Sequence, residues 1–369
     1  MARFRQTLPR LARALLYPDA VSLRDLPAGR HDLRLDFAFR PPDLPTPDAP
    51  DLGTWPRELA IGRTAVYPAP EVFSARLRRV MYWPATNLVL TDRRAPIRDS
   101  TVTVLPIDRR AWTERFTRGV HRLPGTWTVF RSVHLLHNYF HTVVHDASRL
   151  YMLRQPPYCD LPEINLMMPG PPTPAESFVL DRYLPGNVRV QVFDDGRMLR
   201  PDEMILPSFL ARRWMPHLPR PFLDDMLPHF LPDRPRRRCN RIFIGRKEGS
   251  RRRGARNILN EDALWRALQA RGFQRHYLED LGFEQQIELF YDAEAVVGAH
   301  GAGLTNLLYA RDVDVVELHA ARILIPTYYF FSLTLGHRYA WWCADGDHFD
   351  ADFAVDVDAV SARLPAHLR

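Results

Sequence analysis

The residues best suited to chemistry lie in a short turn where three glycines surround one histidine. Segment 295–309 reads AVVGAHGAGLTNLLY, so an apolar run leads directly into the turn and helically spaced leucines follow it. Small residues between a strand and a helix let backbone N–H groups approach a phosphate, and a helix N-terminus favours negative charge. Glycine permits both positive φ angles and close contacts. The turn is therefore predicted to bind an anion.

Side chains around the turn extend this prediction. His300 could donate a hydrogen bond to a phosphate or sugar oxygen, and Thr305 and Asn306 could join it from the first helical turn. The next apolar run, 313–318, contains Glu317 near its end, where a carboxylate can accept hydrogen bonds from ribose hydroxyls. The structural alternative is a tight strand–helix connection with a satisfied histidine and an ion pair at the strand end.

Arginines form a second group. Arg246 follows the predicted strand 241–245, and in a doubly wound sheet that position faces the crevice where ligands bind. A guanidinium there could neutralise a diphosphate and help a nucleoside diphosphate to depart. Arg256, further along a glycine-bearing loop, is a second candidate, and the arginines between them are interpreted as surface charge.

A third group lies on the predicted helix 133–154. His137, His141 and His145 recur every four residues, so they share one helix face. Imidazole and carboxylate groups can be tuned towards neutral pH, so this face, with Asp146 next to it, could supply a general base. Aligned histidines could also bind a metal, and the structural alternative is the polar face of a helix between domains.

The elements that position these groups follow an α/β pattern, preceded by a section of short β-type runs. Strands are predicted at 164–168, 188–193, 204–206, 241–245, 295–299 and 313–318, and helices at 261–271 and 283–291. The predicted domains are 1–60, a basic helix and proline-rich segment; 61–235, a strand-rich section followed by α/β; 236–340, a Rossmann-like domain; and 341–369, a tail whose helix packs back on the first domain.

Composition narrows the classes of partner. The formal charge is +7, which favours an anionic partner, but the arginine runs lack the motifs and aromatic platform of nucleic-acid binding. The three cysteines are odd in number and far apart, which favours a reducing, cytoplasmic setting. No apolar run is long enough to span a bilayer, although the basic N-terminus could lie at the inner face of a membrane.

Ordered sequence blocks resemble those of glycosyltransferase family 61 (DUF563), whose bacterial members are often called capsular polysaccharide biosynthesis proteins. The blocks are Ile244-Gly245-Arg246, 256–261 (RNILNE), Gly272-Phe273, 283–286 (FEQQ), 298–306 (GAHGAGLTN) and Glu317-Leu318. The segment 138–141 (NYFH) is similar to the family's N-Y-x-H-W block. It departs from that block at Thr142, where an aromatic is usual, and at His145, which replaces a common acid and is followed by Asp146.

The resemblance implies a GT-B-like fold, with two Rossmann-like domains and a cleft between them. It also implies an inverting transfer of a sugar from a nucleotide donor, most often a UDP-sugar, to a glycan acceptor that could be lipid-linked, with no essential metal or other cofactor. The implied donor-binding residues are Arg246, Arg256, Gly298, His300, Gly301, Ala302, Gly303, Leu304, Thr305, Asn306 and Glu317. The implied acceptor-side residues are Asn138, Tyr139 and Arg149, and the base is His141, with Asp146 and His145 as rivals. The alternative is a non-catalytic nucleotide- or glycan-binding protein of the same pathway.

Overall fold

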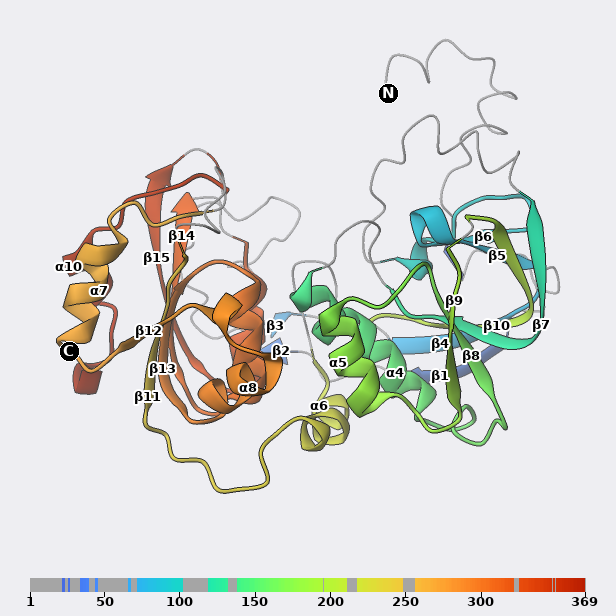
Figure 1. Cartoon of the computed structure of the whole chain (residues 1–369), viewed down its shortest axis with the longest axis horizontal. Coiled ribbons are helices and arrows are strands. Elements are labelled where there is room, and N and C mark those ends of the chain that lie inside the picture. Colours follow the sequence, from blue (N-terminus) through green and yellow to red (C-terminus); the bar gives the residue numbers. More distant parts are fainter. Residues whose placement is uncertain are drawn as a thin grey trace, which may run out of the picture. The chain divides into compact units, whose positions relative to one another are not determined.

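The computed structural model of the chain describes residues 22–23, 26, 34–39, 44–45, 66–67, 72–101, 119–131, 138–194, 196–210, 218–247, 256–321, 325–346, 348 and 350–368. The chain divides into two compact units (Figure 1). The first unit contains residues 1–40 and 71–213, and the second contains 41–70 and 214–369. The predicted basic helix at the N-terminus and most of the proline-rich segment lie outside the described residues.

The first unit is built on an eight-stranded mixed sheet. Its path is β1-β4-β10-β7-β8-β9, where β10, β7, β8 and β9 are parallel, and β5 joins β10 to β6. The strands are β1 (Arg34–Phe39), β4 (Val72–Leu77), β5 (Val80–Trp83), β6 (Leu88–Thr91), β7 (Val120–Val129), β8 (Ile164–Met168), β9 (Val188–Val192) and β10 (Met198–Pro207). Buried side chains such as Leu77, Trp127 and Met167 form one apolar cluster across these strands.

The helices of the first unit follow the parallel strands. A π-helical segment, η5 (His141–Asp146), continues into α4 (Ala147–Leu153), and α5 (Pro174–Tyr183) connects β8 to β9. Thr173 and Glu176 form a capping box at the start of α5, and Glu176 also binds Arg131 just after β7. This bond attaches the first turn of α5 to the carboxyl end of β7. Short 3₁₀ turns complete the unit at η3 (Pro84–Thr86) and η4 (Arg98–Ser100).

The second unit has a five-stranded sheet in which every neighbouring pair is parallel. The strands are β11 (Asn240–Ile244), β12 (Gln274–His276), β13 (Ala293–Ala299), β14 (Asp314–Ala321) and β15 (Arg338–Gly346), in the order β12-β11-β13-β14-β15. This is the doubly wound order 2-1-3-4-5. Nearly every residue of β13 and β14 is buried, as expected for central strands covered on both faces.

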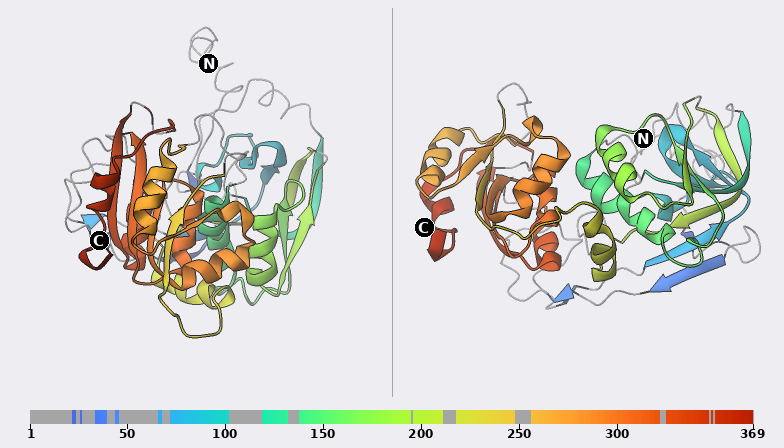
Figure 2. Two further views of the ribbon diagram at one scale, coloured as in Figure 1. Left: turned by 60° about the vertical axis from the view of Figure 1, so that its left-hand side comes forward. Right: turned by 60° about the horizontal axis from the view of Figure 1, so that its bottom comes forward.

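Helices cover both faces of this sheet. The helices α7 (Glu261–Gln269) and α10 (Val357–Ser361) pack on one face, and α8 (Phe283–Tyr291) lies on the other (Figures 1 and 2). The 3₁₀ helix η9 (Ala302–Tyr309) packs against α8 and α9 (Thr327–Leu335). The remaining elements are α6 (Arg220–Met226), η6 (Leu227–His229), η8 (Leu278–Asp280), η10 (Ala366–Leu368) and the short pair β2 (Leu44–Pro45) and β3 (Val66–Tyr67).

The predicted α/β class with parallel strands is confirmed. Cys159, Cys239 and Cys343 form no disulfide. Within the described residues, no helix combines the length and the apolar character that crossing a bilayer requires.

The tail packs differently from its prediction. Arg338–Gly346 forms the edge strand β15, so the predicted domain end at residue 340 cuts through a strand. Phe353, Val355 and Val360 belong to the apolar core of the second unit. The side chain of Asn260, the residue before α7, exchanges two hydrogen bonds with the backbone of Val355. The tail therefore completes the second unit.

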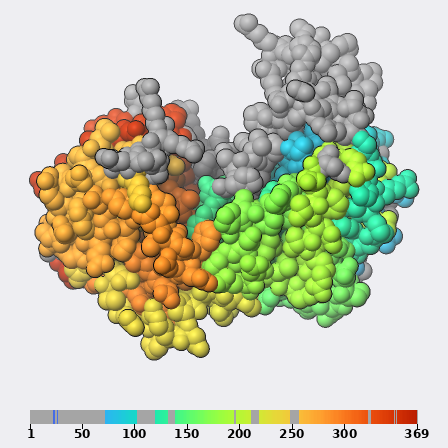
Figure 3. Space-filling view, in the orientation of Figure 1, coloured from blue at the N-terminus to red at the C-terminus, as the bar shows by residue number. Residues whose placement is uncertain are grey.

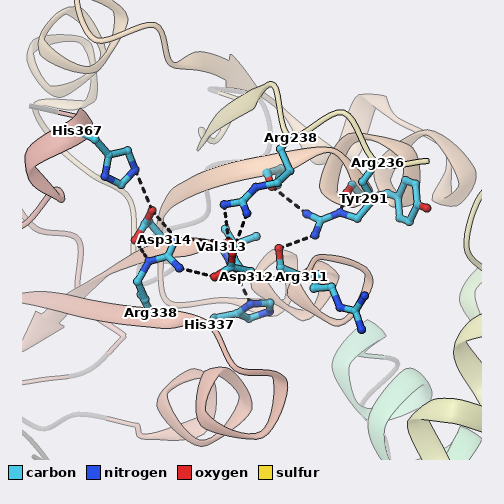
Figure 4. A network of polar contacts seen from close by, with 11 residues as sticks. Arg236, Arg238, Tyr291, Arg311, Asp312, Val313, Asp314, His337, Arg338 and His367 are labelled. Carbon is cyan, nitrogen blue, oxygen red and sulfur yellow. Dashed lines mark hydrogen bonds and ion pairs between the residues drawn. The ribbon is translucent and has the colours of Figure 1, made fainter. Parts of the chain in front are cut away.

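A clamp of arginines attaches the segment 232–238 to the amino ends of the parallel strands (Figure 4). The Arg236 guanidinium donates to three backbone carbonyls, those of Tyr291, Ala293 and Arg311, at 2.5, 3.0 and 2.6 Å. Arg234 forms a two-bond ion pair with Asp292, and Arg238 pairs with Asp312. This basic segment, which spans the predicted domain boundary at 235/236, is thus part of the second unit's structure at this edge.

A buried histidine closes the same edge. The backbone N–H of Val313 donates to Nδ1 of His337, and its Nε2–H donates to the carbonyl of Leu307 at 3.0 Å. These two bonds require the neutral ring with the proton on Nε2. Burial lowers the pKa of His337 to about 4.

Acid should therefore destabilise the protein through His337. The ring's pKa is about 4 when folded and about 6.5 when unfolded, so its contribution is complete above pH ~6.5 and is lost as the pH falls to ~4. The expected loss is about 3 kcal/mol of unfolding free energy, measured by urea denaturation across this range. His337→Gln should be less stable at pH 7 and should show a shallower pH dependence. Parallel pH profiles for the two proteins would contradict this role.

Candidate functional site

The predicted arginine and the predicted glycine turn meet at the carboxyl edge of the second sheet. β11 and β13 are neighbours, but the chain leaves them in opposite directions, through α7 to β12 and through η9 to β14. Ligands of doubly wound sheets bind at such a switch point. Arg246 follows β11, and His300 and Gly301 follow β13. A methyl group placed on Gly301 would lie only 3.2 Å from Nη2 of Arg246, so the guanidinium lies against the turn.

The three glycines of the turn are required for close approach. Gly301 has an extended backbone with φ of 172°, and Gly298 and Gly303 are also outside the left-handed region. A methyl group on Gly298 would lie 3.2 Å from Ile244 on β11, and one on Gly303 would lie 2.8 Å from Leu278. The expectation of positive φ angles was wrong, whereas the expected close contacts are confirmed. The glycines let the turn lie directly on its neighbours and on Arg246.

A buried hydrogen-bonded relay supports His300. Its Nδ1 lies 2.5 Å from Oε1 of Glu317, and the Tyr339 hydroxyl donates to Oε2 of the same carboxylate at 2.5 Å. Burial alone would raise the pKa of Glu317, but His319 and His300 hold it well below its usual range. Burial lowers the pKa of His300 despite the facing carboxylate. A neutral His300 that donates from Nδ1 to an ionised Glu317 satisfies both conditions and leaves Nε2 as the nitrogen that can meet a ligand.

Glu317 therefore acts from a different position than predicted. Its side chain has no exposed surface, and both of its oxygens accept hydrogen bonds from the protein. A direct bond from Glu317 to ribose hydroxyls does not fit this arrangement. Its carboxylate instead orients the His300 ring, in the way that a carboxylate fixes the tautomer of a functional histidine.

Thr305 and Asn306 also support the turn from within. Both side chains are fully buried. The Thr305 hydroxyl bonds to Tyr328 at 3.2 Å, and the Asn306 amide donates to Gln286 and to the carbonyl of Gly303. These bonds hold the first turn of η9 in place, so the predicted contact of the two side chains with an anion is replaced by a positioning role. Ala302 is partly exposed beside them, and Leu304 is in the core.

Two arginines bring positive charge to this edge beside carboxylates, since Arg256 lies 3.7 Å from Asp350 and the charges of Glu279, Asp352 and Glu261 act on Arg246. Burial lowers the pKa of the Arg246 guanidinium, and the positive charge of Arg256 lowers it further. Burial and the positive charge of Arg256 also lower the pKa of His300, so Arg256 acts on both Arg246 and the histidine of the turn. Like charges held together at a helix N-terminus form a site where an anion relieves repulsion. The structure thus places the charge of Arg256 near both Arg246 and His300.

Among the described residues, His300, Glu317 and His319 are of types that bind metals and lie within 4.8 Å of one another. The 2.5 Å contact of His300 with Glu317 is a direct hydrogen bond. Ligands that share a zinc ion at ~2.0–2.2 Å would stand about 3.3 Å apart, so a metal would have to separate this pair. In the structure, His300 and Glu317 thus form a directly hydrogen-bonded pair.

In the first unit, two of the three predicted histidines form a pair. Nδ1 of His141 lies 2.9 Å from Nδ1 of His145, and their rings are stacked. His137 lies outside the described residues. The pair belongs to the π-helical segment η5, a distortion that is frequent at functional sites. This helix follows β7, so the pair comes after the carboxyl end of a parallel strand, as the site of the second unit does.

Burial separates the roles that the two rings can take. His145 is fully enclosed between Phe140 and Phe209, whereas His141 is partly exposed. Burial, with the charges of His141 and Arg149, lowers the pKa of His145 well below its usual value. When a neutral His145 accepts the Nδ1 proton of His141, Nε2 of His141 carries a lone pair, and the proton of His145 is on its Nε2, which is buried with no hydrogen-bond partner among the described residues. Because His141 is the more exposed of the two rings, it is the one that an acceptor can approach.

The other predicted residues of this helix are structural or flank the pair. Arg149 is 1% exposed, donates to the carbonyls of Ser100 and Arg131, and stacks on Phe209. It cannot touch an acceptor from there, so its predicted acceptor-side role is corrected. Asp146 is 4% exposed, and its charge acts on the buried guanidiniums of Arg149 and Arg131.

The segment before the pair remains within reach of solvent. Asn138 and Tyr139 are partly exposed, and Asn138 accepts the backbone N–H of Phe140.

Three residues of the second site were missing from the sequence prediction. His319 lies two residues after Glu317, and side chains two apart on a strand share a face, so this signal was available. Tyr339 lies on β15, which was not predicted as a strand. Tyr328 reaches Thr305 from α9, which was also not predicted. The contacts of Tyr328 and Tyr339 join elements that are distant in the sequence, so no local sequence pattern indicates them.

Glu317→Gln should destabilise the protein at pH 7 by about 1–3 kcal/mol, because a neutral amide presents an N–H group to buried partners that need an acceptor. Urea denaturation measures the difference in unfolding free energy. The control is Glu288→Gln, at an exposed position of α8, whose unfolding free energy should be within about 0.5 kcal/mol of that of wild type. The depressed pKa of Glu317 stabilises the fold above its unfolded pKa of ~4.3 and does so less as the pH falls. The gap between the two proteins should therefore narrow in acid. An unchanged stability of Glu317→Gln at pH 7 would contradict the relay.

A comparison with known protein families identifies the family of this chain. The sequence profile of the family Glycosyltransferase 61 matches residues 7–316, which is well over half of the chain. A search of curated proteins finds no match. The matched segment contains η5 with its histidine pair, Arg246 and the glycine turn. It ends at residue 316, one residue before Glu317. The chain therefore belongs to glycosyltransferase family 61 and is a glycosyltransferase.

Proposed function

We propose that this enzyme transfers a sugar from a nucleoside diphosphate donor, of the UDP class, to a hydroxyl group of a glycan acceptor, with inversion at the anomeric carbon. The observation that carries the proposal is the contact of Arg246 with the Gly301 turn at the switch point of a doubly wound sheet. Backbone N–H groups at the start of η9 and a guanidinium converge there. A diphosphate is the part of such a donor that fits them.

The donor's leaving group explains the charge of the site. Transfer breaks the bond between the anomeric carbon and the diphosphate, whose oxygen gains negative charge in the transition state. Arg246 and Arg256 stabilise that charge without a divalent ion. His300, oriented by Glu317, offers Nε2 to a phosphate or ribose oxygen. We expect activity to persist in EDTA.

The acceptor needs a base. An inverting transfer is a single in-line displacement through an oxocarbenium-like transition state, and the acceptor hydroxyl must lose its proton as it attacks. We assign this role to Nε2 of His141, with His145 accepting the Nδ1 proton and fixing the ring. In this proposal the two units are the two Rossmann-like domains of a GT-B enzyme, and Asn138 and Tyr139 flank the acceptor.

We further propose a cytoplasmic enzyme of cell-surface polysaccharide synthesis, such as that of a bacterial capsule. The cysteines without disulfides support a reducing setting. The net charge of +7 supports a peripheral contact with an anionic membrane that carries a lipid-linked acceptor.

A donor panel tests this function. The purified chain is incubated with UDP-, GDP- and CMP-sugars, with and without glycan acceptors, and nucleotide release and the product's anomeric configuration are followed by NMR. We expect UDP release from a UDP-sugar and a product of inverted configuration. Tight UDP binding with no turnover for any acceptor would favour the non-catalytic binding protein, and a product of retained configuration would exclude the role given to His141.

A further inference from the structure

A cavity of about 500 Å³ opens on the α7 side of Arg246. Its wall includes Arg246, Asn260, Glu261, Asp262, Arg275 and Tyr277, so it lies between the carboxyl ends of β11 and β12 and the start of α7. The surface formed by α7, light orange in Figure 3, lies on the outside of the second unit. This volume is in the usual range for small-molecule sites. The turn at Gly301 contributes no residue to its wall.

We propose that this cavity holds the nucleobase of the donor, which makes Arg246 the divider between a diphosphate subsite and a base subsite. The inference rests on the proposed function. Arg246 faces Gly301 on one side and lines the cavity on the other. A nucleoside diphosphate has the matching order, because its charged diphosphate is covalently continuous with an uncharged base.

The cavity wall carries charges of both signs, with Arg246, Arg266 and Arg275 beside Glu261 and Asp262. Glu261 is 4% exposed, and one of its oxygens accepts the backbone N–H of Arg246. Asp262, beside it, is well exposed and pairs with Arg275 at 2.8 Å. Carboxylates at this wall can accept the ring N–H or amino groups of a nucleobase. An uncharged base with both donors and acceptors suits a wall of mixed charge.

The cavity also offers a flat and preorganised surface. The Arg275 guanidinium lies 5.5 Å from the Tyr277 ring and 5.3 Å from the Trp265 ring, and it is tied to Asp262. A methyl group on Gly245 would lie 3.0 Å from both Tyr277 and Arg275, so this glycine lets them pack against the end of β11. Planar rings and guanidiniums are the groups on which nucleobases stack. Gly245, against which Tyr277 and Arg275 pack, immediately precedes Arg246 in the chain.

Calorimetry with UDP, GDP and inorganic pyrophosphate tests the inference on the full chain. For Tyr277→Ala, we expect the affinity for the nucleotide that wild type prefers to fall by roughly 5- to 150-fold, as for the loss of one stacking partner, with pyrophosphate affinity within about twofold. Tyr277→Phe keeps the ring and should retain nucleotide affinity. Asp262→Asn should lower nucleotide affinity without weakening pyrophosphate.

The outcomes separate the inference from the proposed function. If wild type binds nucleotide and Tyr277→Ala binds it equally well, the base lies elsewhere. If Tyr277→Ala loses affinity only for the nucleotide-sugar and not for the free nucleotide, the cavity holds the sugar and the inference is overturned. Equal losses for nucleotide and pyrophosphate would also overturn it, because they show a general collapse of the site. If wild type binds neither probe, the proposed function fails.

Discussion

Replacing Arg246 with alanine should lower kcat/KM for the sugar donor by about 100- to 1,000-fold, the usual effect of removing one preorganised group that stabilises developing charge. Arg246 lies against the glycine turn, and Arg256 is near enough for its positive charge to act on it. Without this guanidinium, the departing diphosphate loses its closest cation. Initial rates of nucleotide release at varied donor concentration measure the change.

Two variants make this result specific. Arg246→Lys should recover only part of the activity, because an ammonium cannot reproduce the two-pronged contact of a guanidinium with phosphate oxygens. Arg311→Ala removes an exposed arginine at the opposite edge of the same sheet and should act like wild type (Figure 4). Activity of Arg246→Ala within threefold of wild type would show that the diphosphate binds elsewhere.

Replacing His141 with alanine should lower kcat by about 100- to 10,000-fold and leave donor affinity unchanged, the effect expected when a general base is lost. His141 is partly exposed, whereas its partner His145 is enclosed and Asp146 is buried beside arginines. Only His141 of the three has a side chain that an acceptor can approach. Single-turnover transfer measures the chemical step, and calorimetry with the donor's nucleotide measures affinity.

The control for His141 is His121→Gln, a histidine of β7 that packs against Phe193. It should keep transfer close to wild type. His145→Ala should lower kcat less than His141→Ala, because it disturbs the orientation of the base without removing it. Near-normal transfer by His141→Ala with intact donor binding would exclude this residue and direct attention to a base outside the described helix.

The second unit could be predicted well because its strands carry strong local patterns. Parallel strands buried on both faces read as continuous apolar runs, and β13 and β14 are of this kind. β15 was not predicted, because its sequence, RYAWWCADG, forms a partly buried edge strand with charged ends. The tail was misplaced because its contacts, such as Asn260 with Val355, join residues 95 positions apart. Such pairings depend on the finished fold.

The residues of the candidate site could be predicted from the sequence, but the hydrogen bonds that their side chains make could not. The glycine turn, Arg246 and His300 were identified from local pattern and resemblance, and the fold brings them to one edge. Glu317 and Arg149 were identified as ligand contacts, yet both are buried supports. The sequence shows that a polar side chain is present. Its burial in the fold decides whether that side chain can contact a ligand or only supports another residue that contacts the ligand. The spacing of four predicted that His141 and His145 are neighbours but not that one would be enclosed.

The most direct test of the central claim is a crystal structure of the protein with UDP. The account predicts that the diphosphate oxygens lie within hydrogen-bonding distance of the backbone N–H groups at Ala302 and Gly303 and of the Arg246 guanidinium. A diphosphate bound away from this turn, with Arg246 engaged only by protein groups, would contradict it.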